Sequence, residues 1–179
     1  PVIPYGLAPY FNAYPGTICL RVETLMAVVR DVVASLYRSG FRQILIVNGH
    51  AGNNPVAALA QELMSEYDDT SIKFHNWWNA PKTWAKAQTI DKTGSHANWM
   101  ENFPWTRLAH APAPEGEKPV VDMALMKASP PDIARDILGD GAFGGPWQRP
   151  DEEMLALWEI GVKEVREALE GPWSALGTR

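Results

Sequence analysis

The sequence predicts an α/β fold with a largely parallel sheet, and three observations support this. Within a predicted strand at 43–47, residues 44–47 form an unbroken apolar run that contains two isoleucines and a valine, which is typical of a strand buried on both faces. Residues 23–39 carry apolar side chains at helical spacing, and a short connection leads from this helix into the strand. A second helical pattern at 55–67 precedes an alternating strand at 72–78. Helix, short loop and buried strand in this order make half of a βαβ unit.

The length and composition fit one globular domain over residues 1–179. Of the 179 residues, 46% are hydrophobic and 21% charged, which is ordinary for a folded domain of this size. The net charge of -5 and the lack of any Lys/Arg run argue against a nucleic-acid surface. No apolar segment reaches the length of a membrane span. The single cysteine, Cys19, excludes an internal disulfide and a cysteine-rich metal site, and it fits a cytoplasmic location.

The first third of the chain is expected to contain a loop and then a helix. Residues 1–20 are rich in proline, glycine and aromatic residues, and they predict a short strand at 2–3 followed by a structured loop. Helix 23–39 comes next, and Gly40 is expected to end it as the residue after the C-cap. The apolar positions of this helix are Leu25, Val28, Val29, Val32 and Leu36.

The strand at 43–47 leads into a turn that carries a histidine. Asn48-Gly49 is a turn signal, and His50 follows it directly. In open α/β sheets, ligands bind at the carboxyl ends of the strands. Gly49 and Gly52 allow the backbone to come close to another group. A lone histidine in such a turn more often only makes a hydrogen bond, but a second histidine cluster later in the chain favours a functional role.

The next elements follow from short sequence signals. Asn53 or Asn54 followed by Pro55 predicts the N-cap and first turn of helix 55–67. A turn then leads into the strand at 72–78. Residues 80–93 are only weakly helical.

The second histidine cluster lies in residues 94–103. Ser95 is a candidate helix N-cap. In a helix that began there, His96 and Met100 would share a face, and Glu101 would lie roughly 140° round from His96. The chemistry of this stretch therefore centres on His96 and Glu101.

The last part of the chain is expected to be mostly irregular until a final helix. Residues 110–122 and 129–150 are rich in proline and glycine, and such long loops tend to be functional or to lie in an interface. Asp151 is expected to cap a helix over about 152–169. The residues at helical spacing there are Met154, Trp158, Val162, Val165 and Leu169.

Tryptophan is unusually abundant. Five of the eight tryptophans lie between residues 77 and 105, close in sequence to the second histidine cluster. A pocket for a small flat ligand would explain this enrichment, and Trp78 and Trp99 are the candidates for its wall. A tryptophan-rich subunit interface explains it equally well, and core packing is at least as good an interpretation for each tryptophan.

The polar residues at these positions suggest metal-assisted hydrolysis. Imidazole and carboxylate groups, as in His50, His96 and Glu101, are ligands for zinc, iron or manganese. Such a metal polarises a carbonyl or activates a water, and amide hydrolysis also needs an acid that protonates the leaving nitrogen. His96 or Glu101 could supply that proton. Two histidines and one glutamate do not complete a catalytic zinc site. The sequence has no nucleophile elbow, phosphate loop or dinucleotide fingerprint.

Four segments resemble the creatininase family of metal-dependent amidohydrolases. They are "IPYGLAPYFNAYPGTICL" at 3–20, "FRQILIVNGHAGN" at 41–53, "GSHANWMENF" at 94–103 and "GDGAFGGP" at 139–146, and they fall in the family's order. Together with the final helix they cover nearly the whole chain. The Asn-Gly-His segment is fairly specific in combination with the others.

The resemblance implies a three-layer α/β/α sandwich, a binuclear divalent-metal site and hydrolysis of a C–N bond in a cyclic or formyl amide. The metal would be zinc, with manganese or iron as alternatives. By position, His50 matches the family's metal ligand, His96 its proton-transfer histidine and Glu101 the glutamate five residues further on. Trp78 matches a tryptophan that covers the substrate in a family member. Trp99, Asn48 and Gly49 are further substrate-binding candidates.

Three departures from the family pattern qualify this resemblance. A glutamate two residues after the ligand histidine in some members is Gly52 here, as in many relatives. The family's Glu-Thr-Ser is Glu101-Asn102-Phe103, and the preceding Asn98-Trp99 is atypical. The family's N-terminal strand-and-loop unit, with a Glu-x-His pair and a later Asp, has no counterpart in this sequence.

We therefore expect the metal site to be completed by residues outside these 179, either in a further segment or in a partner chain. A metal-free relative of the family is the remaining alternative. The expected partners are a small amide substrate and either further copies of this chain or a chain with Glu-x-His and Asp ligands. Nucleic acid and membrane are not expected partners. The alternative is a non-catalytic subunit that binds a catalytic partner or a small ligand through its tryptophan-rich face.

Overall fold

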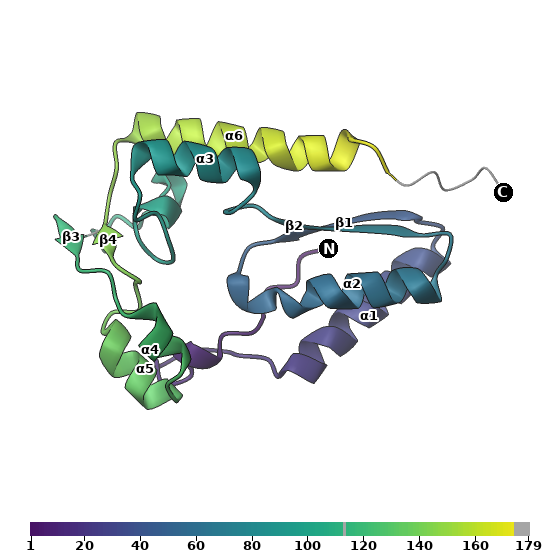
Figure 1. Cartoon of the computed structure of the whole chain (residues 1–179), viewed down its shortest axis with the longest axis horizontal. Coiled ribbons are helices and arrows are strands. Elements are labelled where there is room, and N and C mark those ends of the chain that lie inside the picture. Colours follow the sequence, from purple (N-terminus) through teal and green to yellow (C-terminus); the bar gives the residue numbers. More distant parts are fainter. Residues whose placement is uncertain (113, 174–179) are drawn as a thin grey trace. The chain divides into compact units, whose positions relative to one another are not determined.

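The computed structural model describes residues 1–112 and 114–173. The chain forms two compact units. Figure 1 shows the whole chain, with colours that follow the sequence from the N-terminus to the C-terminus. Unit 1 consists of Pro1–Ala8, Ile18–Ala80 and Lys163–Arg179, and unit 2 of Pro9–Thr17 and Pro81–Val162. Each unit has its own arrangement of elements and is considered by itself.

Unit 1 is built on a parallel pair of strands. Helix α1 (Val22–Arg38) leads into β1 (Gln43–Asn48), and α2 (Pro55–Glu66) leads into β2 (Ser71–Asn76). The two strands pair in parallel over their whole length, from Gln43 opposite Ser71 to Asn48 opposite Asn76. The mixed α/β class and the parallel pairing predicted from the sequence are thus confirmed.

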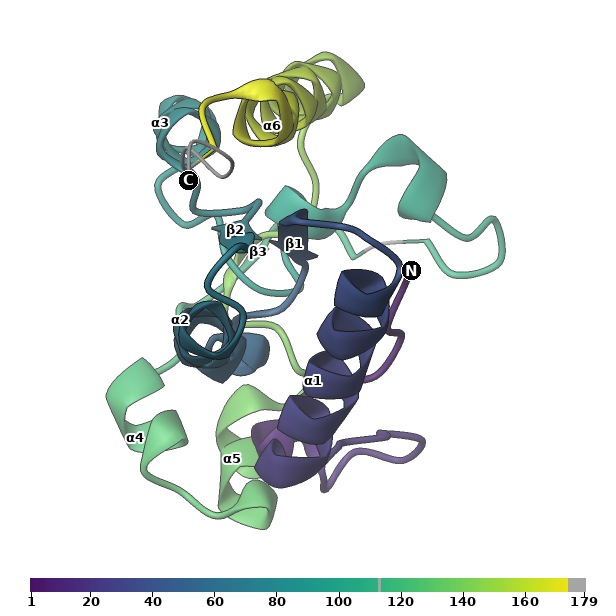
Figure 2. The ribbon, with the colours of Figure 1, turned by 90° about the vertical axis from the view of Figure 1, so that its right-hand side faces the viewer.

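The core of unit 1 lies between the strands and the two helices, which cover the same face of the pair (Figure 2). Side chains alternate along a strand, so Ile44 and Ile72 point together towards α1 and α2. The buried members of this cluster are Leu7, Leu25, Val29, Val33, Ile44, Val56, Leu59, Ala60, Leu63 and Ile72. Gly40 follows α1 with a φ of 91°, which confirms its predicted place after the helix.

The other face of the sheet differs from the prediction. Residues 43–47 were expected to be buried on both faces, but Val47 is 48% exposed. The reason is that this face is covered only in part. Lys73 lies on it and donates from Nζ to the carbonyl of Ala168 at 2.7 Å, near the end of α6 (Asp151–Glu170).

Several other boundaries in unit 1 also differ from the predictions. The expected strand at 2–3 is absent from the described residues, where Gly6 and Cys19 form a single parallel bridge instead. Strand β2 ends at Asn76, so Trp77 and Trp78 lie beyond it. Asn54 is the N-cap residue of α2 and Pro55 its first residue, as predicted, but the Asn54 side chain makes no capping hydrogen bond.

Unit 2 consists of short elements. They are η1 (Pro9–Phe11), α3 (Pro81–Ile90), η3 (Trp99–Glu101), η4 (Pro104–Thr106), β3 (Glu117–Lys118), α4 (Met123–Lys127), α5 (Pro131–Leu138) and β4 (Gly145–Pro146). Strands β3 and β4 pair antiparallel. Met126, Ala134 and Leu138 form a buried cluster, against which Phe11 and Phe143 pack.

Helix α5 lies within residues 129–150, which were expected to be mostly irregular and are so outside this helix. Pro130 is the N-cap residue of α5 and Pro131 its first residue, where the missing N–H costs nothing and the fixed φ suits a helix. The prolines that suggested a loop therefore begin a helix.

The final helix is confirmed, and it begins one residue earlier than predicted. Its buried face is different, because Met154 and Leu157 are wholly buried whereas Trp158 is 46% exposed. No helix among the described residues is long and apolar enough to cross a bilayer.

Candidate active site

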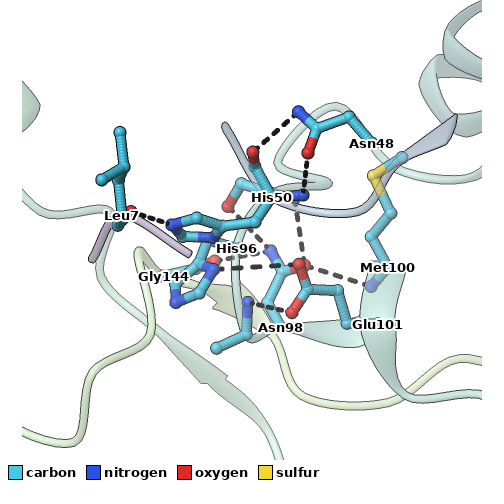
Figure 3. Close-up of polar contacts among 10 residues, drawn as sticks. Leu7, Asn48, His50, His96, Asn98, Met100, Glu101 and Gly144 are labelled. Carbon is cyan, nitrogen blue, oxygen red and sulfur yellow. Dashed lines mark hydrogen bonds and ion pairs between the residues drawn. The ribbon is translucent and has the colours of Figure 1, made fainter. Parts of the chain in front are cut away.

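The turn after β1 is shaped around His50 by one side chain. Asn48 Nδ2 donates to the His50 carbonyl at 2.8 Å, and the His50 N–H donates to Asn48 Oδ1 at 3.2 Å (Figure 3). His50 itself has an extended backbone with a φ of -146° and stands just before η2 (Ala51–Asn53). The side chain of Asn48 therefore holds the backbone of His50 on both sides of its Cα.

Asn48 has little capacity left for a ligand. Its amide also donates to Asn76 Oδ1 at 2.8 Å and accepts from Asn53 Nδ2 at 3.2 Å. The residue is 4% exposed. An asparagine amide has two N–H groups and one oxygen, and all three serve the turn here. The predicted contact between Asn48 and a substrate stays a prediction, while its part in holding the turn is visible.

The ring of His50 is oriented by a backbone carbonyl. Nε2 lies 2.8 Å from the Leu7 oxygen. A carbonyl oxygen can only accept, so Nε2 must carry the proton, and in the neutral ring the lone pair belongs to Nδ1. Histidines that bind metals usually donate their other ring N–H to a carbonyl or carboxylate in this way. The hydrogen bond of His50 Nε2 thus fits a metal ligand that coordinates through Nδ1.

Only one of the two glycines beside His50 is in close contact with other atoms. A Cβ on Gly52 would lie 1.9 Å from the Leu7 oxygen and 2.7 Å from His50 Nε2. A Cβ on Gly49 would meet nothing within 4 Å. The expected close approach of the backbone therefore holds at Gly52 and not at Gly49. It also gives a physical reason why no side chain stands at position 52.

The stretch around His96 is not a helix, so the prediction that His96 and Met100 share a helical face is wrong. Ser95 does not cap a helix, since Asn98 caps the short η3 by accepting from the Met100 N–H. Ala97, between His96 and Asn98, has a φ of 55°. This left-handed residue turns the chain and prevents a continuous helix from His96.

The turn nevertheless brings His96 and Glu101 together. His96 Nδ1 lies 3.8 Å from Glu101 Oε1, and Glu101 Oε2 accepts from the Ala97 N–H at 3.1 Å (Figure 3). The His96 ring also packs against Phe11 and Phe143, at centroid distances of 5.0 and 4.8 Å. A protonated His96 would form an ion pair with Glu101, and this arrangement suits a group that takes up and releases a proton.

The tryptophans predicted to line a pocket lie in different surroundings. Trp99 is wholly buried in unit 2, and its ring lies against Gly94, where a Cβ would come within 2.8 Å of it. This favours core packing for Trp99. Trp78 is half-buried, just after β2 in unit 1. The most exposed tryptophans of unit 2 are Trp105, at 52%, and Trp158, at 46%, whose rings make an edge contact at 4.8 Å.

Four residues that shape these sites could not be assigned this role from the sequence. The Leu7 carbonyl orients His50, the rings of Phe11 and Phe143 enclose His96, and Asn98 caps the turn. Only Asn98 carried a signal, because asparagine is a preferred N-cap. Within residues 1–112 and 114–173, no three His, Cys, Asp or Glu side chains gather as a metal site.

Comparisons with known proteins agree on one family. The family model described as "Creatininase: Creatinine amidohydrolase" matches residues 1–169. A crystal structure from Bacteroides fragilis, of a protein provisionally named a creatinine amidohydrolase, aligns with a TM-score of 0.59 at 24% identity. The alignment covers 94% of this chain and 68% of that one, and at this identity it supports the fold alone. The search of curated proteins returns no match.

Proposed function

Because the chain belongs to the creatininase family, whose members are metal-dependent amidohydrolases, we propose that it hydrolyses a C–N bond in a small cyclic or formyl amide. The observation that supports this best is the state of His50. Its Nε2 donates to the Leu7 carbonyl at 2.8 Å, and histidines that bind metals usually donate their second ring N–H in this way. The bond would be one other than an ordinary peptide bond.

His50 is the proposed metal ligand, and zinc is the proposed metal, with manganese or iron as alternatives. When bound, the metal would polarise the amide carbonyl and activate a water. The part of His50 is to hold the cation at a fixed place at the end of β1. The hydrogen bonds of Asn48 to its backbone support this, because they fix the turn that carries the His50 ring.

His96 is the proposed proton-transfer residue, and Glu101 its acid/base partner. Hydrolysis of an amide requires a proton on the leaving nitrogen, and an imidazole beside a carboxylate can deliver and recover one. The distance of 3.8 Å between His96 Nδ1 and Glu101 Oε1 supports this pairing. The proposed substrate contacts are still Trp78, Trp99, Asn48 and Gly49. For Trp99 and Asn48, the contacts within the fold argue for a structural role.

We also propose that residues outside this chain complete the metal site. His50 is one ligand, whereas catalytic zinc sites have three protein ligands. A chain or segment with Glu-x-His and Asp would supply the others, in a homo- or hetero-oligomer. The parallel sheet is proposed to belong to a three-layer α/β/α sandwich. A cytoplasmic location is proposed with it.

The metal content of the purified native assembly tests whether His50 is a metal ligand. Elemental analysis should find zinc or manganese in the wild type and a strong reduction in His50→Ala, with an unchanged circular dichroism spectrum. His75→Ala is the matched control, because it removes another half-buried histidine one residue before the end of β2. Equal metal content in wild type and His50→Ala would refute the assignment.

The alternative function is a non-catalytic subunit, and one observation favours it. Trp105 and Trp158 form an exposed aromatic pair, 52% and 46% accessible, and such pairs are common in interfaces. Native mass spectrometry of the purified protein would reveal a bound catalytic chain. A metal-loaded assembly of this chain alone that hydrolyses an amide would rule this alternative out.

A further inference from the structure

The turn that carries His96 is held in a strained conformation. Ala97 has a φ of 55° and is the only residue other than glycine with a positive φ in the described parts of the chain. The left-handed region is unfavourable for any residue with a Cβ. Such conformations persist only where contacts with the surrounding structure hold the residue in place, and they occur most often at functional sites.

The side chain that determines this turn is Asn98, which is 2% exposed. Its Oδ1 accepts from the Ser95 N–H at 3.0 Å and from the Met100 N–H at 3.1 Å. Its Nδ2 donates to the Thr93 carbonyl at 2.7 Å and to the Gly144 carbonyl at 2.7 Å. The amide therefore binds the backbone on both sides of His96 and Ala97 and uses its full bonding capacity.

One of these bonds reaches the segment that positions the His96 ring. The Phe143 N–H donates to the His96 carbonyl at 3.2 Å, and the next residue, Gly144, is the one held by Asn98. The ring of Phe143 packs on the His96 ring at 4.8 Å. Asn98 thus fixes both the backbone that carries the imidazole and a wall against which the imidazole rests.

The glycines of this segment show how close the approach is. A Cβ on Gly145 would lie 2.3 Å from Thr93 Oγ1 and 3.0 Å from Asn98 Nδ2, and the φ of Gly145 is 93°. A Cβ on Gly144 would lie 2.6 Å from the Pro119 carbonyl oxygen. Gly145 therefore lets the chain come close to the Asn98 amide, and Gly144 lets the same segment pass close to the backbone at Pro119.

No other side chain of this size can replace the Asn98 amide. Aspartate would keep the bonds from the Ser95 and Met100 N–H groups, but its second oxygen would face the carbonyls of Thr93 and Gly144 without a proton between them. Serine could still cap the Met100 N–H, but it is too short to reach Gly144 as well.

We propose that Asn98 is a positioning residue for His96. It holds the 95–100 turn in its strained form and joins this turn to the Phe143-Gly144 segment, so that the imidazole stays between Phe11 and Phe143 with Nδ1 towards Glu101. The catalytic significance of this rests on the proposed function. The effect on the His96 ring is a separate property that can be measured without a substrate.

The main test compares Asn98→Asp with Asn102→Asp. Asn102 is a matched control, because its Nδ2 also donates to a carbonyl of this part of the chain, that of Trp147 at 3.1 Å, while its Oδ1 accepts from Arg107. Both variants keep an acceptor and lose an amide donor. The readout is the NMR spectrum of the histidine rings in the native protein, with the His96 signals assigned by their loss in His96→Asn.

In Asn98→Asp, the contacts between His96 and Phe143 ring protons should disappear and the His96 ring nitrogen shifts should change. In Asn102→Asp both should stay as in the wild type. Unchanged His96 signals in a folded Asn98→Asp protein would overturn the proposal and leave Asn98 a capping residue alone. If the wild type hydrolyses creatinine, kcat of Asn98→Asp should also fall by about 10²-fold with little change in KM, as expected for a displacement of about 1 Å.

Two further variants keep the test decisive if Asn98→Asp does not fold. Asn98→Ser retains the cap and removes the bond to Gly144, so the same His96 signals should change. Ala97→Gly relieves the left-handed strain, so the double variant Ala97→Gly/Asn98→Ser should recover part of the wild-type His96 signals. A double variant no closer to wild type than Asn98→Ser would contradict the idea that Asn98 holds a strained turn. Altered His96 signals without amidohydrolase activity would support the proposal and count against the function.

Discussion

Gly52→Ala gives the most direct check on how His50 is held. The added Cβ would lie 1.9 Å from the Leu7 oxygen, and because Cβ atoms do not approach other heavy atoms closer than 3.0 Å, this segment must move by about 1 Å. Leu7 is a core residue, 5% exposed, and its N–H donates to Asn53 Oδ1 at 2.9 Å. The shift therefore disturbs the core as well as the bond from His50 Nε2 to the Leu7 carbonyl.

The expected magnitude is the sum of two effects. Overpacking of this kind costs about 1–3 kcal/mol, and a lost hydrogen bond adds about 0.5–1.5 kcal/mol. With a urea dependence of about 2 kcal/mol per molar, a loss of about 2–4 kcal/mol lowers the unfolding midpoint by about 1–2 M. Urea titration followed by circular dichroism measures this shift.

Gly49→Ala is the matched control on the other side of His50. Its Cβ would meet nothing within 4 Å, and Gly49 does not have a positive φ. Replacement of such a glycine by alanine is neutral or stabilises by about 0.4–1 kcal/mol, because the unfolded chain loses freedom. Equal midpoints for Gly52→Ala and Gly49→Ala would refute the close approach of Leu7, and with it the account of how His50 is oriented.

Three further outcomes are expected. His96→Asn should lower kcat by about 10²–10⁴-fold with little loss of stability; an unfolded variant with full activity per folded molecule would make His96 structural. Glu101→Gln keeps an acceptor for the Ala97 N–H but removes the charge beside His96, so kcat should fall while the urea midpoint stays, and unchanged kcat would exclude Glu101 from proton transfer. Burial raises the pKa of Asp140, but hydrogen bonds from Lys118 and the Ala142 N–H outweigh it, so its pKa lies below the ordinary value. Its stabilising effect is therefore complete at neutral pH and is lost as the pH falls through that lowered pKa; Asp140→Asn should flatten the acid decline of the urea midpoint, and an unchanged decline would contradict this.

Much of unit 1 could be predicted from the sequence, because its signals are local and strong. The apolar spacing in α1 and α2, Gly40 after α1, and Pro55 at the start of α2 all specify elements without help from distant residues. The exposure of Val47 could not be predicted in this way, because it depends on what covers the second face of the sheet.

The surroundings of the site residues were less predictable. Leu7 is far from His50 in sequence, and nothing in either segment signals that the Leu7 carbonyl accepts from the His50 ring. Around His96 the spacing suggested a helix, but Asn98 and the left-handed Ala97 turn the chain, and this turn brings Glu101 to His96. Pro130 and Pro131 suggested a loop, because proline disrupts the interior of a helix. Proline is favoured at the start of a helix, however, and these two residues stand there.

The central claim is that this chain takes part in metal-dependent amide hydrolysis through His50. The most direct measurement is hydrolysis of creatinine and of a formylamino-pyrimidine by the native assembly, before and after chelation and again after addition of zinc or manganese. At least one of these amides should be hydrolysed, the activity should be lost on chelation, and metal should restore it in the wild type but not in His50→Ala. Activity that survives chelation, or that metal restores equally in His50→Ala, would contradict the claim.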